Sequence, residues 1–266
     1  MKKMLDLVVT ENTQLNHNYC LIKLTTTDKS LLPDMFPGQF VEVRVDNSPT
    51  TYLRRPISVN FVDKSRNELW LLIQIVGDGT RKMSEYKTGD IVNLLLPLGN
   101  SFSIPETTPQ GKLLLIGGGV GIAPLLFLGA KLKEKGLNPV FLLGARSYND
   151  LLQLDEFAKY GEVFCTTEIA KAEECNYKPE IGYVIDHSIL KLADYSMIYS
   201  CGPKPMMVAV AQYAQKHGIP CEVSLENHMA CGFGVCLCCV EKTREGNICV
   251  CTDGPVFNIE KLTWTN

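Results

Sequence analysis

Cysteines are concentrated near the end of the chain, and their spacing constrains the fold more than any other feature of the sequence. Cys231, Cys236 and Cys239 follow the pattern C-x4-C-x2-C, and Cys249 and Cys251 come shortly after them. This spacing is typical of the plant-type [2Fe–2S] run, which takes a fourth thiolate from further along the chain. Glycines between the first two cysteines let the backbone wrap closely around a cluster and aim N–H groups at its sulfurs. The sequence therefore predicts a small iron–sulfur domain at this end.

The same cysteines leave two questions open. Four soft thiolates also suit zinc, although zinc sites usually use C-x2–4-C pairs, and a disulfide knot is a third interpretation. Seven cysteines lie from Cys221 to Cys251, whereas a cluster needs four, and Cys238 is one of the extra thiols. Cys249 and Cys251 would point to the same face of a strand, so geometry does not choose the fourth ligand.

Composition excludes several classes of function. The chain has 266 residues, of which 45% are hydrophobic, and a net charge of −3. It has no basic stripe that would suit nucleic acid or an anionic membrane. No apolar run reaches the roughly 18–20 residues needed to span a bilayer, and the N-terminal residues lack the apolar region of a signal peptide. Eleven cysteines, most of them late in the chain, indicate a cytosolic metal site rather than a secreted disulfide scaffold. We therefore expect a cytoplasmic protein.

The first hundred residues have a β pattern. Runs rich in β-branched and aromatic residues occupy 19–24, 40–45 and 69–75, and turn signals such as Pro37-Gly38 separate them. Several strands at this spacing favour a closed barrel.

Two stretches interrupt this β pattern. The segment 53–58 contains Arg55 and Ser58, which could offer a guanidinium fork and a hydroxyl to a phosphate, although paired arginines also occur on a solvated strand edge. The segment 76–80 contains Gly79 and could form an anion-binding nest, although a hairpin turn is the simpler interpretation.

From about residue 106 the pattern changes to alternating strands and helices. Residues 112–116 read as a buried parallel strand that leads into the glycine turn 117–124 and then an apolar helix to about Lys135. A strand, a glycine turn and a helix N-terminus make a phosphate site, although a tight strand–helix turn would read similarly. Pro124 replaces the last glycine of the usual dinucleotide fingerprint and is tolerated in a first helical turn.

The alternation continues to about residue 217. Further strands are expected at 139–143, 162–165 and 196–200, and helices at 149–160 and 205–217. Such alternation predicts a parallel sheet whose ligands lie at the carboxyl ends of the strands. The glycine turn and Cys201-Gly202-Pro203 both fall at these ends.

The order of these parts resembles the ferredoxin–NADP reductase superfamily. With the C-terminal cysteines and the closing residues 251–257, the whole chain resembles the electron-transfer subunits of NAD-dependent (class 1B) dihydroorotate dehydrogenases. The resemblance implies a multi-domain β plus α/β fold: an antiparallel FAD-binding β-barrel over 1–104, a parallel-sheet NAD-binding domain over 105–220, and a small [2Fe–2S] domain over 221–266.

The resemblance also implies site residues. It places FAD on Arg55, Pro56, Ile57, Ser58, Leu72, Ile73, Gln74, Gly79 and Thr80. It places NAD on Gly117, Gly119, Gly121, Pro124, Cys201, Gly202 and Pro203. It places the cluster on Cys231, Cys236, Cys239 and Cys251.

The function implied by the resemblance is electron transfer in pyrimidine biosynthesis. A separate FMN-containing catalytic subunit would oxidise dihydroorotate, and electrons would pass through the cluster and FAD to NAD⁺, in a heterotetramer with two subunits of each kind. A flavin is needed in the middle because NAD takes a hydride and a [2Fe–2S] cluster passes one electron. No acid–base residue is expected on this chain. Two alternatives are a different redox partner, as in NADH–ferredoxin-linked NADP reductases or sulfide dehydrogenases, and a non-enzymatic binding module with structural zinc.

Overall fold

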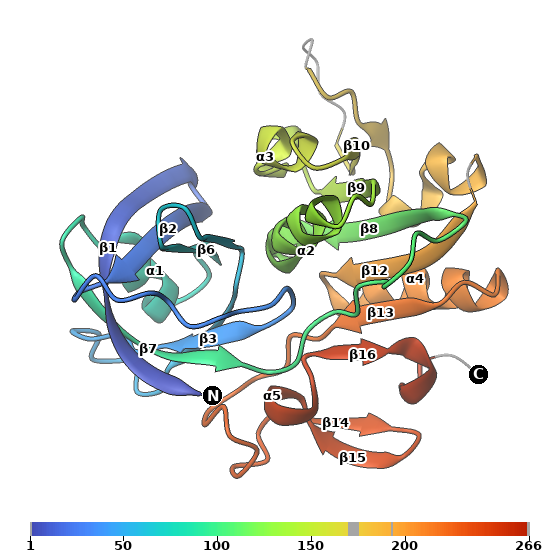
Figure 1. Cartoon of the computed structure of the whole chain (residues 1–266). Helices are drawn as coiled ribbons and strands as arrows, with labels where there is room; N and C mark the ends of the chain where they lie inside the picture. The colour runs from blue at the N-terminus through green and yellow to red at the C-terminus, as the bar shows by residue number, and fades with distance from the viewer. Residues whose placement is uncertain (1, 170–175, 193, 265–266) are drawn as a thin grey trace.

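The computed structural model describes residues 2–169, 176–192 and 194–264. An antiparallel sheet forms the N-terminal part (Figure 1), in the strand order β4-β3-β7-β1-β2-β6-β5. Its strands are β1 (Lys3–Asn16), β2 (Tyr19–Thr26), β3 (Phe40–Val43), β4 (Arg55–Ser58), β5 (Phe61–Asp63), β6 (Glu68–Gln74) and β7 (Ile91–Leu98). The strands expected near 19–24, 40–45 and 69–75 are therefore confirmed as β2, β3 and β6.

The two edges of this sheet are joined by one stretch of chain. Strands β4 and β5 are separated by only two residues, and the hydrogen bonds of the sheet continue through them. The Val59 N–H donates to the Gln39 carbonyl at 2.9 Å, and the Asn60 N–H donates to the Trp70 carbonyl at 3.0 Å. The segment from β4 to β5 thus extends the pairing of β3 at its start and of β6 at its end. This continuity closes the sheet into the expected barrel.

A short helix, α1 (Asp78–Ser84), follows β6. It begins within residues 76–80, so the hairpin turn considered for that stretch is wrong. The physical reason is local, because the Thr80 hydroxyl accepts hydrogen bonds from the N–H groups of Val76 at 2.9 Å and Gly77 at 3.1 Å. These bonds satisfy backbone donors where the chain enters the helix.

The second sheet has the order β11-β10-β9-β8-β12-β13-β16 and is parallel except for β16. Its strands are β8 (Lys112–Gly118), β9 (Pro139–Ala145), β10 (Glu162–Thr167), β11 (Glu180–Ile181), β12 (Tyr195–Cys201), β13 (Cys221–Ser224) and β16 (Val256–Asn258). The helices beside it are α2 (Ala123–Glu134), α3 (Leu154–Ala158) and α4 (Lys204–Lys216). Short 3₁₀ turns occupy Gly119–Ile122, Tyr148–Asp150, Val184–Asp186, Ser188–Lys191 and Ile259–Lys261.

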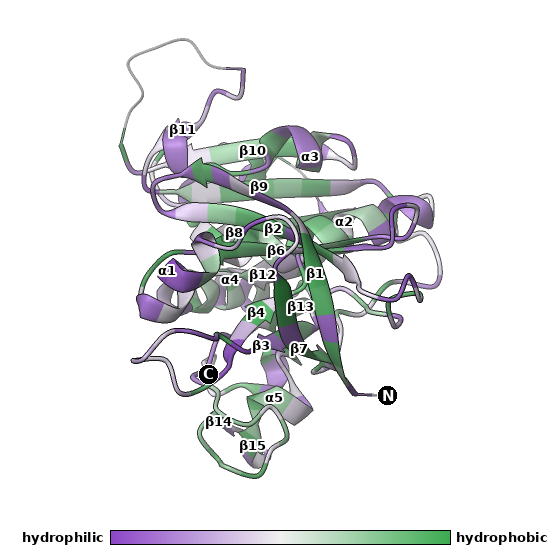
Figure 2. Cartoon of the chain, turned by 90° about the vertical axis from the view of Figure 1, so that its left-hand side faces the viewer, coloured by the Kyte–Doolittle hydropathy of each residue, from purple (hydrophilic) through white to green (hydrophobic). Residues whose placement is uncertain are grey.

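Alternate residues of the central strands face opposite helices. Leu113 and Leu115 pack in one cluster with α2, whereas Leu114 and Ile116 pack in another with α4. Helix α2 also contacts the barrel, because Phe127 belongs to the barrel's own core. This double contact explains why α2 is apolar on nearly all sides, and Figure 2 shows it largely in the hydrophobic colour. Among the described helices, none combines the length and apolar character needed to cross a bilayer.

The helix expected over 149–160 is shorter than predicted, because α3 begins only at Leu154. Gln153, just before it, has a positive φ of 56°. Its side-chain amide donates to Asn60 Oδ1 at 3.0 Å, and the Asn60 amide donates back to Gln153 Oε1 at 3.1 Å. This reciprocal pair between the barrel and the second sheet's helical layer holds the chain in a turn where sequence periodicity suggested a helix.

The C-terminal segment is divided between the second sheet and a separate small unit. Strands β13 and β16 extend the second sheet, whereas β14 (Val240–Thr243), β15 (Gly246–Cys249) and α5 (Val250–Asp253) lie together beside it in Figure 1. Asn100, after β7, holds the end of this unit, since its amide donates to the carbonyls of Asp253 at 2.8 Å and Val256 at 3.1 Å. The region expected as the cluster domain is therefore tied to both larger parts of the molecule.

Candidate functional site

The loop between β13 and β14 brings the predicted cluster ligands against the segment that begins at β15. The Phe233 N–H donates to Cys231 Sγ at 3.3 Å, and the Gly234 N–H donates to Cys251 Sγ at 3.1 Å. The Cys251 N–H donates to Cys239 Sγ at 3.4 Å. Backbone N–H groups aimed at sulfur are the surroundings that an iron–sulfur cluster needs.

This environment stabilises a thiolate at Cys231. Desolvation acts to raise the pKa of its thiol, but the N–H of Phe233 and further hydrogen bonds from Val235 and Cys236 lower that pKa to about 6. In the described part of the chain, no three His, Cys, Asp or Glu side chains already stand at metal-binding separations. The fit to a cluster therefore depends on the soft donor set and on the N–H groups, not on metal–ligand distances.

The loop 225–239 between β13 and β14, called the cluster loop below, contacts the barrel wall at Glu42 of β3. A Cβ built on Gly232 would lie 3.3 Å from Glu42 Cγ and 3.1 Å from Leu98 Cδ1, so the loop backbone is in contact with β3 and β7. Glu42 is fully buried, and neither of its carboxyl oxygens has a hydrogen-bond partner among the described residues. Burial raises the pKa of Glu42 to about 7. Its β4 neighbour in the sheet is Pro56, within the predicted flavin segment.

Arg55, at the start of β4, lies over the first turn of α1. A Cβ on Gly79 would lie 2.9 Å from Arg55 Nε, so the Arg55 side chain packs closely against this glycine. Among the described residues the Arg55 guanidinium forms hydrogen bonds only through Nη1, to the carbonyls of Leu53 and Arg54. The remaining N–H groups are consistent with binding a phosphate.

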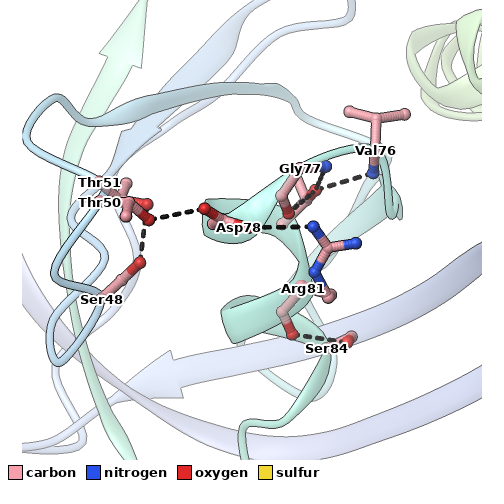
Figure 3. Close-up of polar contacts among 9 residues, drawn as sticks. Ser48, Thr50, Thr51, Val76, Gly77, Asp78, Arg81 and Ser84 are labelled. Carbon is pink, nitrogen blue, oxygen red and sulfur yellow. Dashed lines mark hydrogen bonds and ion pairs between the residues drawn. The ribbon is translucent and has the colours of Figure 1, made fainter.

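Thr80, one of the residues expected to bind FAD, uses its hydroxyl within the turn at the start of α1. Its hydroxyl donates to the Gly77 carbonyl at 3.0 Å while accepting the two backbone bonds at the helix start. The same turn is tied to the loop before β4, because the Thr50 hydroxyl donates to Asp78 at 2.7 Å (Figure 3). Thr80 thus shapes the turn, and backbone N–H groups of the first turn are the donors left for a ligand.

The predicted flavin residues of β6 face different surroundings. Ile73 is fully buried in the barrel core, and Leu72 is buried against the second sheet's helical layer. Their side chains are therefore used in packing, which leaves only backbone groups for a ligand. Gln74, which follows them, donates from its amide to the Tyr19 hydroxyl at 3.2 Å and lines a neighbouring cleft.

This cleft, of about 620 Å³, lies at the carboxyl ends of the parallel strands, between the second sheet and the barrel. Four of the residues expected to bind NAD line it: Gly119, Gly121, Gly202 and Pro203. Gly121 packs directly on the neighbouring turn, since a Cβ there would lie 2.4 Å from Gly202 Cα. Gly117, Pro124 and Cys201, which were also expected to bind NAD, are buried and do not line it.

Sequence reasoning missed most of the charged residues of this cleft. Asp150, Glu168 and Glu226 line it together with Arg146. Desolvation raises the pKa of Glu226. The available signal was position, because Arg146 follows β9, Glu168 follows β10 and Glu226 lies just beyond β13. Residues just beyond parallel strands meet at one edge of the sheet.

Family models match two parts of this architecture. Residues 226–263 match the iron–sulfur cluster binding domain of dihydroorotate dehydrogenase B, and residues 115–212 match the oxidoreductase NAD-binding domain. The dihydroorotate dehydrogenase B (NAD(+)) electron transfer subunit of Fusobacterium nucleatum is 34% identical over 227 residues, which cover 83% of this chain and 84% of that protein. The subunit of the same name from Caldanaerobacter subterraneus subsp. tengcongensis is 38% identical over 230 residues, covering 85% and 86%.

The chain belongs to the family of dihydroorotate dehydrogenase B electron transfer subunits. A solved structure of an NADH-dependent reduced ferredoxin-NADP oxidoreductase matches with a TM-score of 0.83 and 27% identity, over 97% of this chain and 90% of that one. The ferredoxin reductase of carbazole 1,9a-dioxygenase, at 24% identity and a TM-score of 0.68, over 82% of this chain and 67% of that one, shares the fold.

Membership in this family confirms several expectations from the sequence. The expected fold class, the oxidoreductase class and the cofactor set of FAD, an iron–sulfur cluster and NAD are confirmed. The match of residues 226–263 to an iron–sulfur cluster binding domain favours an iron–sulfur cluster over structural zinc at these cysteines. An electron transfer subunit also implies a catalytic partner subunit.

Proposed function

We propose that this chain carries electrons from an FMN-containing dihydroorotate-oxidising subunit, through a [2Fe–2S] cluster and FAD, to NAD⁺ in de novo pyrimidine biosynthesis. The proposed complex is a cytoplasmic heterotetramer with two subunits of each kind. Bound FAD would exchange a hydride with NAD and single electrons with the cluster. The chain itself would bind and orient these groups and would supply no acid–base residue.

The observation that carries this proposal is the position of Glu42. Its side chain touches the cluster loop at Gly232, and its strand pairs with Pro56 in the flavin segment. Gln74 and Tyr19, also from the barrel, line the nucleotide cleft. The barrel residues proposed to hold FAD therefore lie on a wall that meets the cluster loop on one side and the cleft on another. This is the order that a relay from cluster to flavin to NAD requires.

The proposed roles follow from these contacts. Arg55 would offset the charge of the FAD pyrophosphate, with the first turn of α1 beside it. Cys231, Cys236, Cys239 and Cys251 would hold the cluster. Gly119, Gly121, Gly202 and Pro203 would let the NAD backbone approach the ends of β8 and β12.

The partner subunit would dock beside the cluster loop. Phe233, Val235 and Leu237 on this loop are exposed by 46%, 78% and 64%. Three exposed apolar side chains on one short loop are characteristic of a protein interface. Docking there would bring the partner's cofactor next to the cluster.

The decisive experiment is an anaerobic absorption spectrum of the purified complex before and after dihydroorotate is added. Bleaching of flavin and iron–sulfur bands, followed by recovery with NAD⁺, is expected. Cys236→Ser should abolish dihydroorotate-driven NAD⁺ reduction while FAD stays bound, whereas Arg55→Ala should lower FAD retention in gel filtration. Normal turnover of the Cys236→Ser complex would contradict the relay.

A second candidate keeps the relay and changes the partner. It is favoured by the match over 97% of the chain to a structure of an NADH-dependent reduced ferredoxin-NADP oxidoreductase. In that case NADH, but not dihydroorotate, would bleach the bands of the complex.

A further inference from the structure

Cys249 contacts the loop that carries three of the predicted cluster ligands. It ends β15, and its Sγ donates to the Gly234 carbonyl at 3.6 Å. The N–H of the same Gly234 donates to Cys251 Sγ at 3.1 Å. Cys249 and Cys251 therefore approach one residue of the cluster loop through its two backbone groups.

Cys239 is a second neighbour that the two cysteines share. Cys239 is followed by Val240, which pairs with Cys249 across β14 and β15. The backbone turns around it, since the Val250 N–H donates to the Cys239 carbonyl at 3.2 Å and the Cys251 N–H donates to Cys239 Sγ at 3.4 Å. The Cys249 backbone is fixed in this turn because its N–H donates to Asp253 at 2.8 Å.

Cys238 provides a contrast within the same chain. It is also an extra cysteine and is adjacent in sequence to Cys239, but its side chain is exposed. Among the described residues, the Cys238 thiol forms no hydrogen bond to the loop like the one that joins Cys249 to Gly234. Proximity in sequence alone therefore does not bring a thiol into the group.

We propose that Cys249 is a reserve fourth ligand of the iron–sulfur cluster, able to replace Cys251. The inference rests on the proposed ligand set. In the exchange, the bond between iron and the Cys251 sulfur would break and one to the Cys249 sulfur would form, while the proton of the Cys249 thiol would pass to the Cys251 sulfur. No electron is transferred, so the exchange needs no oxidant or reductant. A thiolate is the same soft donor from either position.

The test compares iron and labile sulfide per chain in complexes purified without oxygen. Cys251→Ala should keep most of its iron and sulfide, with an altered EPR signal after reduction by dithionite. The double variant Cys249→Ala/Cys251→Ala should retain several-fold less. The matched control Cys238→Ala/Cys251→Ala should behave like Cys251→Ala. Equal iron loss in Cys251→Ala and in the Cys249 double variant would overturn the proposal.

Two further outcomes are separable. If the wild-type complex itself holds zinc or lacks labile sulfide, the proposed function fails, and the reserve-ligand proposal fails with it. If Cys251→Ala does not retain FAD, Cys251→Ser is compared with Cys249→Ala/Cys251→Ser, because a serine oxygen can itself bind iron. The resonance Raman bands of the iron–ligand stretches should differ between these two variants, because only Cys251→Ser still has Cys249 as a fourth sulfur ligand. Identical spectra would refute the proposal.

Discussion

The contact between the glycine turn and the Cys201–Pro203 turn predicts a large effect of Gly121→Ala. The added Cβ would lie 2.4 Å from Gly202 Cα, 2.5 Å from Gly202 N and 2.6 Å from the Cys201 carbonyl oxygen. All three atoms are backbone, and Cys201 pairs with Gly117 in the adjacent strands β12 and β8. Neither turn can yield by a side-chain rotation. We expect the free energy of unfolding to fall by about 3 kcal/mol, the upper part of the usual range for overpacking.

Gly119→Ala is the matched control in the same turn. Gly119 has a φ of 56°, and its added Cβ would meet only the Tyr19 hydroxyl, at 3.9 Å. The expected cost is therefore backbone strain alone, about 1 kcal/mol. The difference between the two variants, about 2 kcal/mol, isolates the steric contact between the turns.

Urea unfolding of the FAD-loaded protein gives the free energy of unfolding of both variants, and an NADH titration gives their affinity for NADH. Gly121→Ala should also bind NADH more weakly than Gly119→Ala, because separating the two turns displaces Gly202 and Pro203 at the rim of the cleft. The reasoning is refuted if the two substitutions lower the free energy of unfolding equally, or if Gly121→Ala leaves it unchanged.

Three other perturbations test the surrounding structure. His187 is buried, and desolvation lowers its pKa, so its contribution to stability is complete above its ordinary pKa and falls as pH decreases through it. His187→Asn keeps an acceptor for the Ile189 N–H and should remove this loss between pH 7 and 5 in urea unfolding. Burial raises the pKa of Glu42 from 4.5 to about 7, so the contribution of Glu42 to stability is fully present below pH 4.5 and is lost as pH rises through 7. Glu42→Gln should therefore stabilise the protein at pH 8 by up to about 3 kcal/mol and have little effect at pH 4.5 in urea unfolding. Asn100→Ala removes the hydrogen bonds to the carbonyls of Asp253 and Val256 and should speed iron loss to a chelator while FAD is retained. An unchanged rate of iron loss would show that these hydrogen bonds do not hold the cluster unit in place.

Local sequence was sufficient to predict the strands β8, β9, β10 and β12 of the second sheet and the turns at their carboxyl ends. The run 112–116 is continuously apolar and became β8, and the turn that follows it lines the cleft. These features depend on residues that are neighbours in sequence. The same is true of the C-x4-C-x2-C run, whose N–H groups point at its own sulfurs.

The features that could not be predicted depend on contacts between distant residues. Nothing near Glu42 in sequence indicates that Gly232 will cover it and leave its carboxyl without a partner. The turn at Gln153 likewise depends on Asn60, far away in the barrel. Thr80 was expected at the FAD site because its position matches a motif, and in the structure its hydroxyl donates to the Gly77 carbonyl. A motif therefore indicated the candidate residues, and tertiary contacts decided what each of their side chains does.

Strand β13 sets the separation between the nucleotide cleft and the cluster. It pairs with β12, and the chain leaving it passes Glu226 in the cleft before it reaches Cys231. Five residues of extended chain span at most about 18 Å, so the first predicted cluster ligand cannot lie farther than this from Glu226. On the return, β16 pairs with β13 again just after Cys251. The cluster segment thus begins and ends on one strand of the nucleotide-binding sheet, and the barrel wall at Glu42 closes its remaining side. In the proposed arrangement, a flavin held by that wall would lie between the two, and the connectivity of the chain would keep the relay short.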